Sequence, residues 1–302
     1  MVARKKATKA SKSKKNPKRS AKAKSKTKAA AQSKSKTKAK AQSAKAARGA
    51  KAKAKPSKAA KAKSAKVKSA GKSKAQKPIE LYFWPTPNGL KISIALEELR
   101  LPYEIYPINI SKGDQFAPEF LKISPNNRIP AIVDPKGPGG KPISIFESGA
   151  ILKYLGEKTG KLYPKDWRKR VAVDEWLFWQ VGGLGPMAGQ AHHFIYAAPE
   201  RIPYPTERYI KESARLYGVM DKVLADRPFL AGAYSIADIA AYGWATAHER
   251  HLVPFDGLKN VQRWFDAVAS RPAVKRGQAV GADLRPPPPP PPSLASVTSN
   301  SP

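Results

Sequence analysis

The 302-residue sequence contains no cysteine. This absence excludes a disulfide framework, a zinc site built on cysteine ligands and a cysteine nucleophile in the chain itself. The sequence also lacks any uninterrupted apolar run of about 18 residues, the length that a membrane-spanning helix needs. We therefore expect no transmembrane helix and no membrane partner.

Acidic and aromatic residues are both missing from residues 1–77. This segment, called the basic tail below, holds 27 Lys and 3 Arg, which is +30 of the formal net charge of +35 and leaves +5 for the other 225 residues. Val2 and Val67 are its only branched aliphatic residues. Such a composition cannot offset a backbone ordering cost of about 1–2 kcal/mol per residue. We expect residues 1–77 to be disordered.

The basic tail resembles the lysine-rich tails of linker-histone-like proteins. Its charge predicts nonspecific binding to nucleic acid or another polyanion by counterion release. Because it has no aromatic side chain for base stacking, no sequence specificity is expected. It also lacks the apolar region of a secretory signal, so a cytoplasmic protein, nucleoid-associated through the tail, is the expectation. A misassigned start codon, which would make the tail artefactual, is the alternative.

The other end of the chain is also of low complexity. Pro286–Pro292 is an unbroken proline run, and the Ser-rich Ser293–Pro302 follows it. A proline run forms a polyproline II rod that aromatic grooves can bind. The simpler interpretation is that residues 284–302 form a Pro-rich disordered tail after the last folded element.

Residues 78–161 show the pattern of a compact α/β domain. Strands are predicted where β-formers alternate or cluster, and helices where apolar residues recur at helical spacing. The expected strands are Ile79–Trp84, Tyr103–Ile108, Ile129–Val133 and Pro142–Phe146, and the expected helices are Leu90–Leu99, Gln115–Lys122 and Glu147–Lys158. The resulting order is β-α-β-α-β-β-α.

Residues 162–283 read as helical throughout. The amphipathic stretches lie near Trp167–Leu184, Tyr204–Ala225, Ile236–Arg250 and Val261–Ser270. We expect Trp176, Phe178 and Trp179 to form core and interdomain packing. His192 and His193 do not indicate a metal site, because adjacent residues point to different faces of a helix and no carboxylate or cysteine completes a ligand set.

Two segments of the first domain carry a family resemblance. Arg128–Val133 (RIPAIV) and Phe146–Ile151 (FESGAI) resemble the glutathione-binding half of the glutathione S-transferase superfamily. The resemblance implies an α/β thioredoxin-like N-terminal domain with a cis proline at Pro130, followed by an all-α C-terminal domain. In the second domain, Ser235–Asp238 (SIAD) resembles the family's buried capping box, with Ser235 as the N-cap and Asp238 at N3.

Further motifs narrow the resemblance to one class. Phe83–Gly89 (FWPTPNG), Gly113–Phe116 (GDQF), Ser124–Asn127 (SPNN) and Trp179–Pro186 (WQVGGLGP) closely resemble the bacterial Nu class, whose relatives include the yeast prion-type nitrogen regulator. The match covers essentially all of Pro78–Arg271 and neither tail. It implies a homodimer.

The candidate site follows from the chemistry of glutathione together with this resemblance. Glu147 and Ser148 begin a helix, whose free N–H groups and dipole can receive the γ-glutamyl carboxylate. The Glu147 carboxylate can bind the ammonium, and the Ser148 hydroxyl adds a donor. The backbone of Ile129 can pair with the cysteinyl moiety. The resemblance places Gln115 and Arg128 near the glycyl end, although both could equally be solvated loop residues.

Thr86 and Asn88 are the candidate catalytic residues. They flank the start of the first helix, where a hydroxyl, an amide and backbone N–H groups can stabilise a thiolate. The first loop has no Tyr, Ser or Cys, unlike the commoner classes, and an Asn-Gly pair alone also marks an ordinary turn or helix start. The resemblance places Arg208 at the carboxylates of the ligand, whereas a lone helical arginine is usually a surface charge.

The resemblance implies an enzyme, a glutathione-dependent disulfide-bond oxidoreductase. Glutathione is the expected cosubstrate, a small disulfide or electrophile the second substrate, and no metal is expected. Conjugation and peroxide reduction are expected as secondary activities. The alternative is a glutathione-binding regulatory or non-enzymatic module that the basic tail tethers to nucleic acid, because a fold does not fix a function.

Overall fold

The computed structural model describes residues 77–284 and 290–299. The predictions for residues 1–76 and for most of the proline run lie outside the described residues. Within the described residues, no helix is both long and apolar enough to cross a membrane.

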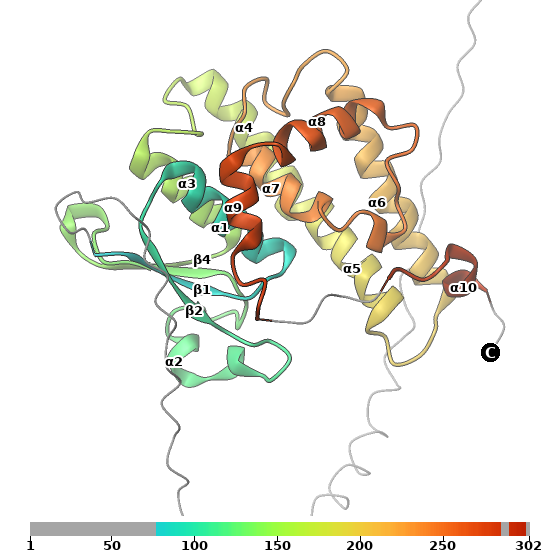
Figure 1. The fold of residues 1–302 in the computed structure, drawn as a ribbon, viewed down its shortest axis with the longest axis horizontal. Helices are drawn as coiled ribbons and strands as arrows, with labels where there is room; N and C mark the ends of the chain where they lie inside the picture. The colour runs from blue at the N-terminus through green and yellow to red at the C-terminus, as the bar shows by residue number, and fades with distance from the viewer. Residues whose placement is uncertain (1–76, 285–289, 300–302) are drawn as a thin grey trace, which may run out of the picture. The chain divides into compact units, whose positions relative to one another are not determined.

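A four-stranded mixed sheet forms the centre of the first domain (Figure 1). Its strands are β1 (Ile79–Phe83), β2 (Tyr103–Pro107), β3 (Ala131–Asp134) and β4 (Ile143–Phe146), in the order β2-β1-β3-β4. β1 pairs in parallel with β2 and antiparallel with β3, and β4 pairs antiparallel with β3. Alternate residues of β1 are fully buried because they share one face of the pleat.

Helices cover both faces of this sheet (Figure 1). α1 (Pro87–Leu99) and α3 (Ser148–Thr159) pack against each other on one face, and the short α2 (Pro118–Leu121) lies on the other. α2 follows the 3-10 turn η1 (Asp114–Phe116), and a second turn, η2 (Pro138–Gly140), joins β3 to β4. The β-α-β-α-β-β-α order expected from the sequence is confirmed.

The second domain is helical, as expected. Its elements are α4 (Trp167–Trp179), the π-helical turn η3 (Gln180–Leu184), α5 (Gly185–Tyr196), α6 (Pro203–Val223), α7 (Ile236–Ala245), the 3-10 turn η4 (Glu249–His251), α8 (Lys259–Ala269), α9 (Pro272–Ala279) and α10 (Leu294–Thr298). The interruption by η3 lets the chain continue from α4 into α5 without a loop.

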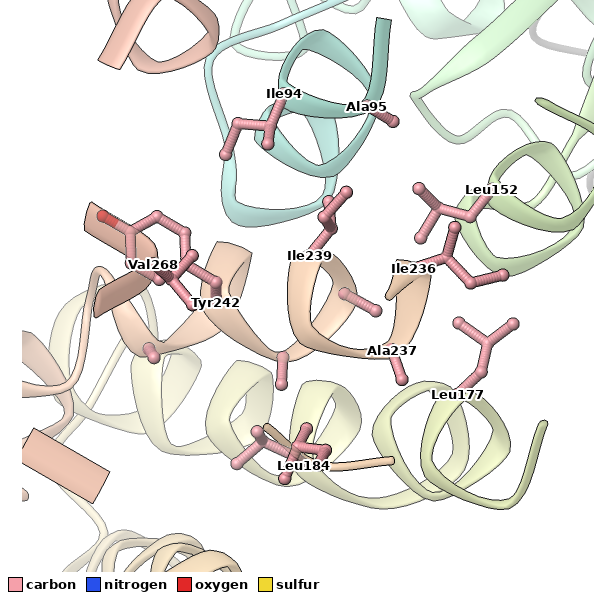
Figure 2. Packing of buried hydrophobic residues seen from close by; sticks show 14 of the residues in the cluster. Ile94, Ala95, Leu152, Leu177, Leu184, Ile236, Ala237, Ile239, Tyr242 and Val268 are labelled. Carbon is pink, nitrogen blue, oxygen red and sulfur yellow. The ribbon is translucent and has the colours of Figure 1, made fainter. Parts of the chain in front are cut away.

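α7 is the helix that joins the two domains. Figure 2 shows Ile236 and Ile239 of α7 facing Leu152 of α3 and Ala95 of α1, with Leu177 and Leu184 on the other side. Nine of its ten residues are buried, so its core contacts lie on every side. Its N-terminus carries the expected capping box between Ser235 and Asp238, which satisfies backbone donors at a helix start that water cannot reach.

Two details differ from the sequence-based expectations. Phe178 was expected in the core, but its side chain is 63% exposed, because Val173 and Leu177 form the buried stripe of α4 and Phe178 lies off it. Trp176 and Trp179 do pack against the core. The segment after residue 283 was expected to be disordered, yet α10 forms there and buries Val297, and α10 packs against α6.

Candidate functional site

A cavity of about 230 Å³ opens where the N-termini of α1 and α3 meet the loop before β3. Its lining includes five of the residues proposed from the sequence. The residues around it are Asn88, Ser124, Arg128, Ile129, Pro130, Phe146, Glu147 and Ser148. The fold thus brings together segments that are up to 60 positions apart in the chain.

The start of α3 forms one wall of this cavity. Ser148 is the first helical residue and Glu147 is the N-cap, with φ 68° and ψ 116°. A positive φ is unusual for a residue with a side chain and costs on the order of 1–3 kcal/mol. The Glu147 side chain makes no capping bond to the helix. Within the part of the chain that the structure describes, no side chain caps the first N–H groups of α3, and they can receive an anionic ligand.

The loop before β3 forms the opposite wall. The peptide bond between Ile129 and Pro130 is cis, as the resemblance implies. The buried Ser124 hydroxyl donates to the Arg128 carbonyl over 2.8 Å and holds this loop. Within the described residues, the Ile129 backbone takes part in no backbone hydrogen bond, which leaves its N–H and C=O for a peptide-like ligand.

The start of α1 brings an amide to the cavity. The Thr86 hydroxyl oxygen caps α1 by accepting from the Gly89 N–H over 3.2 Å. Asn88 accepts a hydrogen bond at Oδ1 from the Trp244 indole N–H of α7, over 2.9 Å. A Cβ at Gly243 would lie 2.5 Å from the Pro87 carbonyl oxygen, so glycine there is needed for α7 to approach the start of α1.

Lys91 is a residue of this region that the sequence analysis missed. Its side chain is 1% exposed and lies directly behind the cavity wall. The ammonium donates to the Gln180 Oε1 of η3 over 2.6 Å and to the Ser148 Oγ of α3 over 3.3 Å. Burial lowers the pKa of Lys91 to about 7, against the attraction of the nearby Glu147 carboxylate.

The contact between Lys91 and Ser148 orients the hydroxyl. A serine hydroxyl has one proton to donate and oxygen lone pairs to accept with. In its protonated form Lys91 can only donate, so the ammonium occupies a lone pair of the Ser148 oxygen. The Ser148 proton therefore remains for an acceptor in the cavity, such as a carboxylate. The sequence signal for this lysine is that it is the only charged residue of the stretch Pro87–Leu96, which by itself does not show that the side chain is buried.

A pH-dependent stability difference is expected between the natural chain and Lys91→Met. The folded-state pKa of Lys91 lies below its usual value of 10.5, so the unfolded chain binds more protons between about pH 7 and 10. The natural chain should therefore gain stability relative to Lys91→Met as pH rises through this window, by up to about 1.4 kcal/mol per pH unit.

Urea unfolding at several pH values and one protein concentration measures this difference. Lys122→Met, which removes an exposed lysine, is the matched control and should show no such trend. A difference between the natural chain and Lys91→Met that stays constant with pH would contradict the burial of an ionisable amine here.

Three of the sequence-predicted residues do not line the cavity. Thr86 lies beside it, and its oxygen already caps α1. Gln115 sits on η1, where its buried Oε1 has no hydrogen-bond partner within the described residues. Arg208 is on α6 and lines a second cavity of about 250 Å³, together with Met187, Tyr209, Lys211, Glu212 and Arg215. The two cavities share no lining residue.

The chemistry of the first cavity suits a small zwitterionic peptide. It offers a carboxylate at Glu147, a guanidinium at Arg128, and the backbone groups of Ile129 between them. The described residues contain no cluster of three or more His, Asp or Glu that could hold a metal ion. Because the chain has no cysteine, any thiol in this cavity must arrive with a ligand.

Comparisons with known proteins agree with this geometry. Residues 77–157 match the model of the glutathione S-transferase N-terminal domain, and residues 185–272 match that of the C-terminal domain. The chain is 54% identical over 204 residues to the disulfide-bond oxidoreductase YfcG of Escherichia coli, a match that spans 67% of this chain and 94% of the relative.

Solved structures resemble it as well. A glutathione transferase from Pseudomonas putida, with one glutathione disulfide bound per subunit, is 46% identical with a TM-score of 0.66, covering 69% of this chain and 94% of the other. A glutathione transferase from Burkholderia graminis, with two glutathione molecules bound per subunit, is 45% identical with a TM-score of 0.65, covering 68% and 89%.

Proposed function

Because the chain belongs to the glutathione S-transferase family, we propose that it is a glutathione-dependent disulfide-bond oxidoreductase. The observation that carries this proposal is the cavity at the start of α1 and α3, which offers an amide for a sulfur atom in a chain that has no thiol of its own. Bound glutathione then supplies the reacting sulfur.

The proposed reaction is a pair of thiol–disulfide exchanges. The thiolate of bound glutathione attacks one sulfur of the substrate disulfide, forming a mixed disulfide and releasing the other half as a thiolate. A second glutathione thiolate then attacks the mixed disulfide, giving glutathione disulfide and the second product thiol. The net reaction consumes two glutathione molecules for each disulfide reduced. Binding of glutathione disulfide or of two glutathiones by the related structures is consistent with this stoichiometry.

In this proposal the residues of the cavity have separate roles. Glu147 binds the glutathione ammonium, and Ser148 with the α3 N-terminus binds the γ-glutamyl carboxylate. The Ile129 backbone pairs with the cysteinyl unit, while Arg128 and Gln115 face the glycyl end. The Asn88 amide stabilises the thiolate, with Thr86 supporting it through the α1 N-terminus. The Arg208 assignment to a glutathione carboxylate stays a prediction.

Reduction of 2-hydroxyethyl disulfide by glutathione tests the proposal. The purified protein should accelerate the reaction well beyond the rate with free glutathione. A rate equal to that of free glutathione would contradict an oxidoreductase. Calorimetric binding of glutathione in the absence of any acceleration would instead favour the regulatory alternative.

Replacing Glu147 with glutamine is expected to act on binding. The change removes the charge at the ammonium subsite but keeps the side-chain shape, and a hydrogen bond to a charged group contributes about 1.5–3 kcal/mol. Glutathione affinity should therefore fall about tenfold to a hundredfold, while turnover at saturating glutathione is retained. Calorimetry and saturation kinetics measure the two quantities.

Glu119→Gln is the matched control for this variant. It removes an exposed carboxylate on α2 whose partner is Lys122, and glutathione affinity should not change. A collapse of saturated turnover in Glu147→Gln with unchanged affinity would contradict the assignment of the ammonium subsite.

A homodimer is the proposed assembly. An apolar stripe on α4 supports it, because Trp167 is 72% exposed and Phe178 is 63% exposed, with the partly exposed Val171 one turn from Trp167. Exposed aromatic side chains at helical spacing are typical of a protein–protein contact. Sedimentation equilibrium of the natural chain and of Phe178→Asp tests this assembly.

The basic tail is proposed to hold this cytoplasmic enzyme on nucleic acid. Deleting residues 1–77 removes +30 of the net charge, so the remaining chain should lose its retention on duplex DNA while its glutathione chemistry is kept. For the full chain, log affinity should fall linearly with log salt, with a slope of about −0.9 per phosphate neutralised, and equally for different sequences. Salt-sensitive binding by the truncated chain would place the nucleic-acid site in the folded domains.

A further inference from the structure

Among the residues that the structure describes, Trp244 alone forms a hydrogen bond with the side chain of Asn88. Its indole Nε1 lies 2.9 Å from Asn88 Oδ1, and the two residues are 156 positions apart. Asn88 belongs to α1 in the first domain, and Trp244 belongs to α7 in the second. This bond therefore connects the helical domain to the amide that faces the cavity.

The chemistry of the indole group fixes which way the amide points. An indole N–H can donate a hydrogen bond but cannot accept one, so the amide atom that faces it must be the oxygen. The two ends of a planar amide point in different directions. With Oδ1 held by Trp244, the Nδ2 group is the one left for the cavity, and no acceptor among the described residues pairs with it.

The orientation matters because the two ends of the amide act oppositely on a thiolate. The Nδ2 group is a donor and lowers the energy of a nearby negative charge, whereas Oδ1 carries partial negative charge and raises it. An asparagine without a fixed partner can rotate between the two states. A group that acts on a developing charge contributes most when it is already oriented before the reaction.

Trp244 itself is held in place by close packing. A Cβ at Gly185 of α5 would lie 3.1 Å from Trp244 Nε1, and a Cβ at Gly189 would lie 3.2 Å from Trp244 Cη2. The buried His251 ring lies on another side, with its centroid 5.8 Å from that of Trp244. Burial lowers the pKa of His251 to about 3, so this neighbour is neutral at physiological pH.

We propose that Trp244 is a positioning residue, which orients the Asn88 amide so that Nδ2 and not Oδ1 faces the sulfur of bound glutathione. The inference rests on the proposed role of Asn88 and adds a residue of the helical domain to it. Trp244 is assigned no contact with the substrate, and its effect reaches the sulfur through Asn88 alone.

The variant Trp244→Phe tests this assignment. It removes the N–H donor and keeps an aromatic ring between α5 and His251. Turnover of disulfide reduction at saturating glutathione should fall about fivefold to tenfold, as expected for one lost hydrogen bond. Glutathione affinity should change by less than about twofold. The pKa of the bound glutathione thiol should rise, because an unfixed amide stabilises the thiolate less.

A double-mutant cycle separates positioning from a general structural role. In the Asn88→Ala background there is no amide to orient, so adding Trp244→Phe should cause no further loss of turnover. An equal loss from Trp244→Phe in both backgrounds would overturn the proposal. Trp176→Phe, which alters a half-buried indole of α4 outside the cavity, is the matched control and should keep full turnover.

The outcomes also distinguish this inference from the proposed function. If Asn88→Ala alone left turnover unchanged, the role of Asn88 and the inference built on it would both fail. If Asn88→Ala lowered turnover and Trp244→Phe did not, the inference alone would fail. A crystal structure of the natural protein with glutathione, which depends on no variant, should retain the bond between Trp244 and Asn88, and its loss would overturn the proposal.

Discussion

Asn88→Ala is expected to lower the turnover of disulfide reduction by about 30-fold to 1,000-fold, with little effect on glutathione affinity. Loss of one donor to a developing negative charge costs on the order of 2–4 kcal/mol in comparable oxyanion sites. Affinity should be spared because most contacts to the tripeptide lie at its ends, near Glu147, Ser148 and Arg128. Saturation kinetics together with calorimetry separate the two effects.

Thr86→Ala is the informative companion to this variant. The Thr86 oxygen is engaged as the cap of α1, so its removal should cost about 1 kcal/mol of folding stability. Its effect on turnover should be similar to that of Asn88→Ala or smaller, because Thr86 does not line the cavity and acts on it only by capping α1. Small and equal changes of turnover and affinity in Asn88→Ala would contradict a role at the sulfur.

Asp238→Ala should have the largest effect on stability, on the order of 5 kcal/mol. The Asp238 carboxylate is fully buried and accepts from the backbone N–H groups of Leu230 and Ser235 and from the Trp264 indole, each over 2.9 Å. Removing it leaves these three donors without an acceptor inside the protein. Such a loss is a large fraction of the stability of an ordinary domain.

Urea unfolding at about pH 8 measures this loss. Burial raises the pKa of Asp238 to about 6, so the carboxylate is ionised in the natural chain at that pH. Asp256→Ala removes an exposed carboxylate and should change stability by less than about 0.5 kcal/mol. A similar small change in Asp238→Ala would show that the capping network contributes little to the fold.

The order of the elements could be predicted from local sequence patterns. The alternation in Ile79–Trp84 and the apolar spacing in Leu90–Leu99 each identify one element without knowledge of the rest. The capping box of Ser235 and Asp238 is also local, since its residues are three apart and both bonds are present in the structure. Family resemblance added the cis peptide bond before Pro130, which no local pattern reveals.

The supporting residues of the site could not be predicted in this way. Lysine is normally exposed. Only the packing of α1 against α3 and α7, and the hydrogen bond from Lys91 to Gln180 of η3, show that Lys91 is buried behind Ser148. The bond between Trp244 and Asn88 joins residues 156 positions apart. Contacts of this kind are set by how the domains pack, and a single sequence does not show which residues meet.

The error at Phe178 has a related cause. An aromatic residue in an amphipathic helix was assigned to the core, but α4 buries only Val173 and Leu177 fully and leaves Phe178 exposed. Hydrophobicity alone does not distinguish a core face from a face that another protein covers. The helix α10 was missed because its segment has the composition of a low-complexity tail. In the structure this segment nevertheless forms a helix and buries Val297.

This cysteine-free chain is proposed to activate the thiol of bound glutathione. A pH titration of thiolate absorbance in the glutathione complex, with the spectrum of the free protein subtracted, measures this activation. Since the chain has no cysteine, the signal reports glutathione alone. Burial raises the pKa of tyrosines such as Tyr82 and Tyr103, so these side chains do not ionise in the same range.

We expect the thiol pKa of bound glutathione to lie about one unit or more below the value of about 8.5 for a free cysteine thiol. Asn88→Ala should return it toward the free value. If the thiol bound to the natural chain titrates like that of free glutathione, the protein does not activate it.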